Sequence, residues 1–405
     1  MKKIMDWLSN SFAPKMVKVN TNVWIVSIKE SIMQVLPFIF LGSIFCMLAV
    51  LGDFISPWPN FWTPFTYTMG MISLIISFLI PFNLMEKKKL RKSRINAGAA
   101  SLVSFLMVLK PVWTDAGLAF NADGFGAGGM FVAIIVAVFV GVVMSAFGKF
   151  SFFKEESVLP DFVRAWFDSM LPIGVVVVTI WVLVFIVDLN LYSLITAAFQ
   201  PFASIVETPW GFAIMMFIFT FLYSMGISSW VLTPVFTPVL LAAITANMAG
   251  TASNLVTDTT IYSAYLWWGG IGCTFPLVLM LMLSKSKKLK ALGYASFPAS
   301  IFNINEPVVF GAIVWNPILM IPFWIIGLVL PLSTWLFTKV IPFAPIPKVL
   351  FQMWYTPMPL STWITTGGAI SGVLLFLLNV ALASAIYYPF FKVYEKQEVE
   401  AEKLG

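Results

Sequence analysis

The sequence predicts an all-α protein that crosses a membrane many times. Hydrophobic residues make up 60% of the 405 positions and charged residues only 10%, whereas soluble domains have roughly 45–50% and about 25%. A soluble chain of this length could not bury so much apolar surface, so lipid must be its solvent. Apolar runs of about 20 residues, enough to cross ~30 Å of hydrocarbon, recur along the whole length.

The basic residues lie between these apolar runs. Of the 24 Lys and Arg residues, 21 fall into five groups. The groups are Lys2–Lys29, Lys87–Arg94, Lys149–Arg164, Lys285–Lys290 and Lys392–Lys403. Such spacing is typical of the positive-inside bias, and it argues against nucleic acid as a partner. We therefore predict a multi-pass protein of a bacterial inner membrane, with the lipid bilayer as its surroundings and both termini in the cytoplasm.

Basic groups on one side of the membrane require an even number of crossings between neighbouring groups. The first two intervals satisfy this rule with spans at Ser31–Leu51, Pro64–Leu84, Ala97–Trp113 and Met130–Phe147. Further spans are predicted at Leu171–Val187, from near Trp210, at Tyr262–Leu283 and near Thr366–Phe391. The apolar stretch Thr233–Ala249 contains Pro234 and Pro238, which favour a re-entrant or interfacial piece.

The two halves of the chain differ in regularity. Up to about residue 190 the apolar runs are continuous, and beyond about 200 they are interrupted by Pro, Gly, Asn and Ser. Broken helices at membrane depth are tolerated where they are buried in protein or line a cavity, and in transporters they mark the substrate site. We therefore predict a membrane scaffold over residues 1–195, a substrate-binding transport domain over 196–395 and a cytoplasmic tail over 396–405.

The strongest local signal is the stretch Ile301-Phe-Asn-Ile-Asn-Glu-Pro-Val-Val-Phe-Gly311, which places Asn303, Asn305 and Glu306 between apolar flanks. Pro307 disfavours helix at Glu306 and suits the first turn of a following helix, so the chain should turn there. Carboxylate and amide groups match a hydroxyl-rich ligand without requiring a counter-charge. We predict that these three side chains bind a small polar solute; the simpler alternative is that Glu306 caps a helix end or faces water.

Two more segments supply candidate contacts. Ser228 and Ser229 end an apolar run, where they would form a polar wall of the cavity or allow close helix packing. Trp267, before Gly269 and Gly270, would stack on a sugar ring or belong to the interfacial aromatic belt. Both alternatives stay open for each segment.

Several chemistries are not expected in this chain. It has no His and no Gly-x-x-x-x-Gly-Lys-Ser/Thr phosphate loop, so neither a phosphohistidine nor ATP hydrolysis by that motif is available. Cys46 and Cys273 lie far apart in apolar stretches and are interpreted as small buried hydrophobic residues. We predict no catalytic residue, no metal site and no cofactor.

From Asn303 to Gly311 the sequence resembles the membrane C component of bacterial phosphotransferase-system sugar transporters, in the lactose/cellobiose/diacetylchitobiose group. The likeness covers most of the chain. It continues in Val158-Leu-Pro-Asp-Phe-Val163 with Leu171-Pro172, in Asn316-Pro-Ile-Leu-Met-Ile-Pro-Phe323, in Thr365-Thr-Gly-Gly368 and in Ile386-Tyr-Tyr-Pro-Phe-Phe-Lys-Val-Tyr394. Gly368 joins the predicted sugar-binding residues on this basis.

The resemblance implies a homodimer whose protomers have about ten transmembrane helices and two re-entrant hairpins. An N-terminal interface domain would hold a C-terminal transport domain that carries a neutral sugar, such as cellobiose or diacetylchitobiose, by an elevator-like motion. The family's conserved acid maps onto Glu306. A cytoplasmic B component, itself supplied by an A component, would then phosphorylate the sugar.

The chain departs from the family pattern at three places. It has Ala312 where the family often has Pro after the motif's Phe-Gly. It has Gly226-Ile-Ser-Ser229 where the family commonly has Gly-Ile-His-Gly, which puts Ser228 in the place of the His. It has Gly367-Gly-Ala-Ile-Ser371 where Gly-Gly-Asp-Trp-Arg is usual. Two other functions therefore stay open: a gradient-driven sugar carrier of the same fold that lacks phosphorylation, and a non-transporting sugar sensor.

The basic groups lead to a topology prediction. Single cysteines placed at Lys88, Lys154, Lys288 and Lys396 should all react with a membrane-impermeant thiol reagent only from the cytoplasmic side, because every group follows the positive-inside bias. Labelling of intact cells and of inverted vesicles measures this. One position labelled from outside would contradict the even-crossing topology.

Overall fold

The computed structural model describes residues 7–52, 55–148, 150–152 and 160–404. Lys154 and the beginning of the Val158–Val163 stretch lie outside this part of the chain. The described residues are mostly helical, and their strands form a single two-stranded hairpin. This confirms the predicted all-α class.

The chain divides into two compact units. One comprises residues 19–201 with the short segment 233–238, and the other comprises 1–18, 202–232 and 239–405. We call them the N-terminal unit and the C-terminal unit. The boundaries fall inside helices α2 (Ala13–Asn20), α10 (Leu191–Val206) and α12 (Thr233–Met248).

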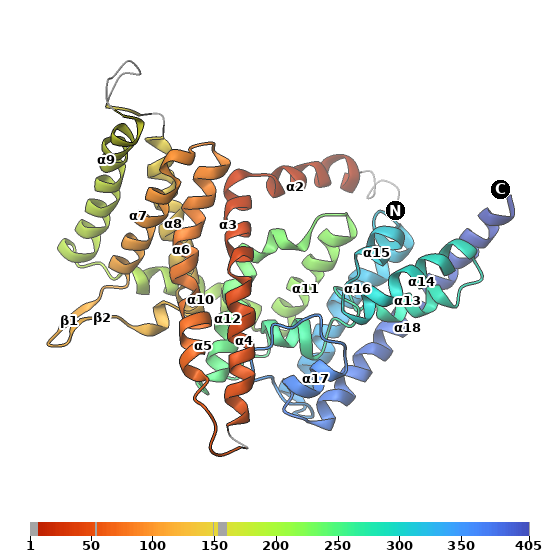
Figure 1. Ribbon diagram of the computed structural model, residues 1–405. Helices are drawn as coiled ribbons and strands as arrows, with labels where there is room; N and C mark the ends of the chain where they lie inside the picture. Colours follow the sequence, from red (N-terminus) through yellow and green to blue (C-terminus); the bar gives the residue numbers. More distant parts are fainter. Residues whose placement is uncertain (1–6, 53–54, 149, 153–159, 405) are drawn as a thin grey trace. The chain divides into compact units, whose positions relative to one another are not determined.

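The N-terminal unit is a helix bundle. Helix α6 packs along both α7 and α8, and α3 packs along α6 (Figure 1). Its helices are α3 (Val23–Gln34), α4 (Leu36–Leu51), α5 (Trp62–Thr68), α6 (Ile72–Lys87), α7 (Arg94–Val108), α8 (Met130–Ala146) and α9 (Asp161–Trp181). The hairpin strands β1 (Val112–Thr114) and β2 (Gly117–Ala119) pair antiparallel between α7 and α8.

Polar contacts mark the two ends of this bundle. At one end Lys88 Nζ donates to Ser145 Oγ at 3.0 Å, and at the other Lys110 Nζ pairs with Asp188 at 2.5 Å. The basic group Lys87–Arg94 thus lies at the end where α6 and α8 finish and α7 begins. This is the arrangement that the even-crossing rule predicts for the interval between these groups.

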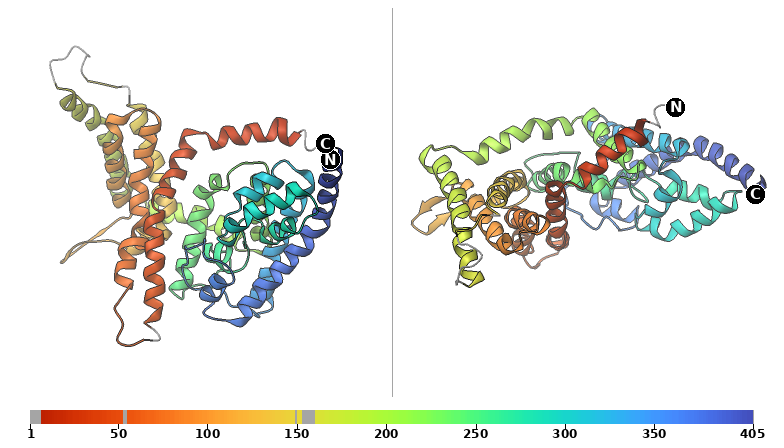
Figure 2. Two further views of the ribbon diagram at one scale, coloured as in Figure 1. Left: turned by 45° about the vertical axis from the view of Figure 1, so that its right-hand side comes forward. Right: turned by 90° about the horizontal axis from the view of Figure 1, so that it is seen from above.

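The C-terminal unit consists of helices that are repeatedly interrupted. Helix α16 packs along both α11 and α18, and α13 packs along α14 (Figures 1 and 2). Its helices are α11 (Pro209–Ser224), most of α12, α13 (Phe275–Met282), α14 (Lys287–Ile301), α15 (Glu306–Val308), α16 (Pro317–Trp335), α17 (Leu360–Thr365) and α18 (Ile370–Leu404). Single π-helical turns occur at Thr260–Ala264, Val309–Ile313 and Leu336–Val340.

Seven helical segments among the described residues are long and apolar enough to cross a membrane, or eight if the bent pair α10 and α11 counts as one span. The stretch Thr233–Ala249, expected to be re-entrant or interfacial, is mostly the continuous helix α12, with Pro234 in its first turn. The expected span Tyr262–Leu283 is wrong as a continuous helix. It is interrupted between Ala264 and Phe275, where Gly269, Gly270 and Gly272 adopt positive φ, a conformation that right-handed helix excludes.

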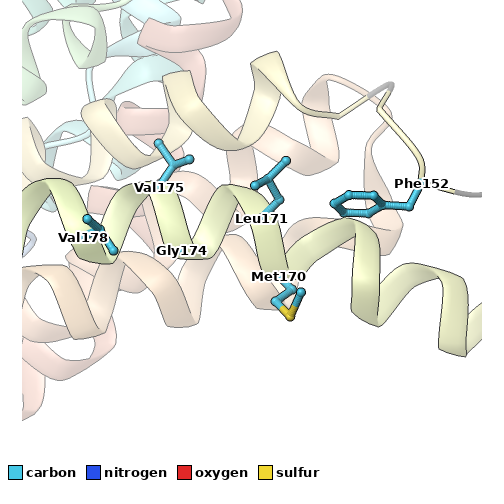
Figure 3. Close-up of a pocket in the computed structure, with 6 residues that line it drawn as sticks. All are labelled: Phe152, Met170, Leu171, Gly174, Val175 and Val178. Carbon is cyan, nitrogen blue, oxygen red and sulfur yellow. The ribbon is translucent and has the colours of Figure 1, made fainter.

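An apolar groove lies along α9 in the N-terminal unit (Figure 3). It is lined by Phe152, Met170, Leu171, Gly174, Val175 and Val178. Ligand sites for polar solutes need a few placed polar groups, and this lining has no polar side chain. The groove suits acyl chains rather than a sugar, and the candidate site lies in the other unit.

Candidate functional site

The candidate site begins where α14 ends, at a residue in the left-handed conformation. Asn303 has φ of 60°, and the backbone N–H groups of Ile304 and Asn303 donate to the carbonyls of Ala299 and Ser300, each at 3.1 Å. This pair of bonds is a Schellman motif, and asparagine is one of the few residues that tolerate its left-handed position. The motif ends α14 sharply and turns the chain toward Glu306.

Three other helices of the C-terminal unit end in the same way: α11, α12 and α17. Gly226, Gly250 and Gly367 follow them with φ of 74°, 71° and 65°, and each forms the same pair of backbone bonds together with the next residue. Glycine adopts this conformation without a Cβ penalty. The motifs at Gly226 and Gly367 place Ser228 and Gly368 just after helix ends, and Ser229 begins the short 3-10 helix Ser229–Leu232.

The Asn303 side chain joins three separate segments of the unit. Its Oδ1 accepts from the Gly269 N–H at 3.0 Å, and its Nδ2 donates to the carbonyls of Trp354 and Thr356 at 2.7 and 3.0 Å. The residue is buried. Because both amide hydrogens and the oxygen are used inside the protein, Asn303 holds the turn in place, and its direct contact with a solute stays a prediction.

Asn305 anchors the same glycine-rich loop from the other side of the turn. Its Nδ2 donates to the Ile271 carbonyl at 2.8 Å, and its Oδ1 accepts a long bond from the Tyr223 hydroxyl at 3.4 Å. A Cβ on Gly270 would lie 2.6 Å from Asn305 Cγ, and Gly270 has φ of 99°. The position therefore requires glycine on both counts.

Glu306 differs from every other described carboxylate between residues 202 and 404. The others each have a hydrogen-bond or ion-pair partner: Glu207, Asp258, Glu395, Glu398, Glu400 and Glu402. Within that part of the chain the Glu306 carboxylate alone has none, and the residue is exposed at the first position of α15. Its two oxygens are therefore available as acceptors.

Aromatic side chains lie close to Glu306 in the sequence and present free surface. Phe302 is 49% exposed and Phe310 is 56% exposed. Large aromatic side chains provide much contact area for a ligand, so these two residues are candidates for the site. Their exposure is what distinguishes them from other phenylalanines, and exposure could not be predicted from the sequence.

The end of α11 packs against the segment that follows Glu306. The Trp315 N–H donates to the Ser224 carbonyl at 3.1 Å, and a Cβ on Gly226 would lie 3.5 Å from Val314. Ser228 is half-buried, and its Oγ accepts a long bond from the Trp230 N–H at 3.4 Å. The structure thus brings the Gly226–Ser229 segment beside the chain around Phe310 and Trp315, within one unit.

Trp267 and Gly368 have mainly internal contacts. Trp267 is 5% exposed, and its ring lies edge-on to those of Tyr262 and Phe219 at centroid distances of 4.7 and 5.7 Å. Gly368 closes the α17 cap, and a Cβ there would lie 3.3 Å from the Trp363 ring. Sugar contact by either residue stays a prediction, and both have a packing role that explains their identity.

The irregular segment 344–356, which no sequence pattern predicted as part of the site, lies between the broken helices. Its backbone carbonyls accept from Asn247, Thr259, Ser263 and Tyr265, at Pro347, Val349, Phe351 and Pro345 respectively. Gln352, on this segment, donates to Asp258 at 2.5 Å. These partners are 80 to 100 residues apart in the chain, so no local pattern could have predicted them.

Comparison with known proteins identifies relatives of this arrangement. Residues 29–327 match the family model described as phosphotransferase system, EIIC. A solved structure, the transporter ChbC, which is the IIC component of the N,N'-diacetylchitobiose-specific phosphotransferase system, is similar with a TM-score of 0.86 and 28% sequence identity. The match covers 98% of this chain and 99% of that one.

Curated relatives show a similar degree of likeness. The putative permease IIC component YwbA of Bacillus subtilis is 27% identical over 93% of this chain and 92% of its own length. The cellobiose-specific EIIC component of Geobacillus stearothermophilus is 26% identical over 100% of this chain and 97% of its own length. The lactose-specific EIICB component of Staphylococcus epidermidis is 27% identical, over all of this chain and 73% of that protein.

The glycine-rich loop gives a prediction about the rigidity of the turn. Gly270→Ala should destabilise the protein by about 1–2 kcal/mol through left-handed strain, and by a further 1–3 kcal/mol, roughly, because the buried Asn305 amide loses its place. Gly250→Ala is the matched control, since Gly250 also has positive φ but nothing within 4 Å of an added Cβ. Thermal unfolding of the purified variants measures both. Equal losses would contradict the anchoring role of Asn305.

Proposed function

This chain belongs to the phosphotransferase system EIIC family, and from that premise we propose that it carries a neutral β-linked disaccharide, such as cellobiose or diacetylchitobiose, across the bacterial inner membrane. The observation that supports the proposal most directly is the exposed carboxylate of Glu306, which has no hydrogen-bond or ion-pair partner among the described residues. The relatives named for cellobiose, lactose and diacetylchitobiose support a substrate from this group of sugars.

The chemistry at Glu306 suits a sugar hydroxyl. A carboxylate accepts hydrogen bonds from hydroxyl groups, and a charge-assisted bond of this kind is about twice as strong as a neutral one. Asn303 and Asn305 fix the backbone that leads into Glu306, so the acceptor is held ready before the sugar arrives. Ser228 contributes a hydroxyl from the neighbouring segment, in the place of the family's His, and Ser229, Trp267 and Gly368 complete the proposed set.

We assign the translocating role to the C-terminal unit. All seven proposed contact residues lie in it, and its loops are joined by hydrogen bonds between segments far apart in the chain. Such a unit can move as one body with its sugar, in an elevator-like motion. The N-terminal unit, with its regular helices, then acts as the membrane scaffold and homodimer interface, and both termini lie in the cytoplasm.

Phosphorylation of the sugar is assigned to a cytoplasmic B component, which receives its phosphate from an A component. Both cysteines of this chain, Cys46 and Cys273, are buried with 1% exposure. A phosphate carrier needs an accessible, thiolate-stabilising setting, which neither cysteine has. Relatives named EIICB support a B component as the partner.

Replacing Glu306 tests the site. Loss of a buried hydroxyl's partner costs about 1–3 kcal/mol, and more when the partner is charged, so Glu306→Ala should weaken cellobiose or diacetylchitobiose binding by roughly ten- to a hundredfold. Glu306→Gln keeps one acceptor and should cost less, and Ser228→Ala less still. Calorimetry on folded, dimeric protein measures the affinities.

Glu400→Ala is the control for this series, because Glu400 is exposed and its only ion pair among the described residues is a 4.0 Å contact with Lys396. It should bind sugar as the wild type does. Wild-type affinity in Glu306→Ala would place the site elsewhere.

Coupling to phosphate is tested in vesicles. Uptake of labelled cellobiose or diacetylchitobiose should require phosphoenolpyruvate, the general relay proteins and the A and B components, because this chain has no accessible phosphate carrier. The sugar recovered inside should be phosphorylated. Uptake driven by an ion gradient alone would favour a carrier, binding without uptake would favour a sensor, and a phosphocysteine on this chain would refute the division of roles.

A further inference from the structure

The cytoplasmic part of α18 carries an acidic stripe, defined here as Glu395, Glu398 and Glu402. Their spacing of three and four residues places them on one face of the helix. That face meets the turn between α13 and α14, and Figure 1 shows α18 running beside both helices. Glu400, between them in sequence, pairs instead with Lys396 along α18 itself.

Glu402 caps the N-terminus of α14 from more than a hundred residues away. One carboxylate oxygen accepts from Ser286 Oγ at 2.6 Å and from the Lys288 N–H at 2.9 Å, and the other accepts from the Lys287 N–H at 3.1 Å. Ser286 Oγ itself accepts from the Leu289 N–H at 3.2 Å. The first helical N–H groups, which have no partner within a helix, are therefore satisfied by Glu402 and Ser286 together.

The other two carboxylates secure the same turn. Glu395 is 6% exposed and accepts from the Lys285 N–H and from Lys392 Nζ, each at 2.8 Å. Glu398 pairs with Lys288 Nζ at 2.8 Å. The acidic stripe thus binds the backbone or side chain of Lys285, Ser286, Lys287 and Lys288, the residues with which α14 begins.

The opposite end of α14 carries the candidate site. The helix has 15 residues, which is about 22 Å at 1.5 Å per residue, and Asn303 follows its last turn. A helix transmits a displacement of its first turn to its last through its backbone hydrogen bonds, of which Pro298, near the end of α14, removes one. The start of α14 therefore helps to fix the place of the Asn303–Glu306 turn, together with the partners of Asn303 and Asn305.

We propose that the acidic stripe of α18 positions the sugar site: Glu395, Glu398 and Glu402 hold the start of α14, and α14 holds Glu306. The C-terminal part of α18, residues 395–402, then acts as a structural support of the transport unit, which we call the strut, and not as a free tail. The proposal rests on the proposed function only in taking Glu306 as the sugar contact.

Hydrogen exchange on the full-length protein in nanodiscs tests the strut. Glu402→Ala should speed amide exchange about tenfold, both in the first turn of α14 and in residues 303–309, because the cap and the turn open together. Glu402→Gln keeps one acceptor oxygen and should lie between the wild type and Glu402→Ala. Glu400→Ala removes the same charge from the opposite side of the helix and should leave both regions unchanged.

The affinity of the same samples for cellobiose gives the second readout. Glu402→Ala should raise the Kd for cellobiose severalfold, and Glu400→Ala should leave that Kd unchanged. Faster exchange confined to residues 287–291, with 303–309 as in the wild type, would show a local cap only and overturn the proposal. If wild-type protein binds no disaccharide, the proposed function fails, and the exchange at 303–309 still decides whether the acidic stripe holds the turn.

Discussion

The C-terminal unit depends on one constraint: a backbone N–H or carbonyl group away from water must find a partner inside the protein. Broken helices create many such groups, and asparagine side chains satisfy them. Asn303 binds one N–H and two carbonyls, Asn305 binds the Ile271 carbonyl, and Asn247 binds the carbonyls of Asn254 and Pro347. An amide has a donor and an acceptor on one planar group, so it can replace a missing stretch of helix bonding.

This constraint also explains why the acid and its neighbouring amides have separate roles. An unpaired carboxylate in an apolar setting is expensive, so it persists where a ligand or water can reach it. Glu306 is exposed and unpartnered among the described carboxylates of residues 202–404, whereas Asn303 and Asn305 are buried and bonded. The turn thus uses its two buried amides for internal hydrogen bonds and leaves a single charged group exposed.

The sequence was sufficient for the fold class and for the turn at Pro307, because both follow from local rules: apolar run length and the φ restriction of proline. It was not sufficient to predict the interruption of the expected span Tyr262–Leu283. The stretch is apolar on average, but three of its glycines adopt positive φ. Nor could it show the partners of Asn303, because Trp354 and Thr356 lie more than 50 residues away. Direction of a side chain, inward or outward, is decided by such distant partners.

The same reasoning connects the two ends of α14. At its far end an asparagine in the left-handed conformation ends the helix, and at its near end a carboxylate from α18 supplies the acceptors that its first turn lacks. Neither device is local to the helix, since one depends on segment 344–356 and the other on the C-terminal residues. A helix whose two ends are fixed by remote parts of one unit cannot shift independently of that unit. A carrier that moves its site as a rigid body needs this property, and a helix capped only by its own neighbours would not provide it.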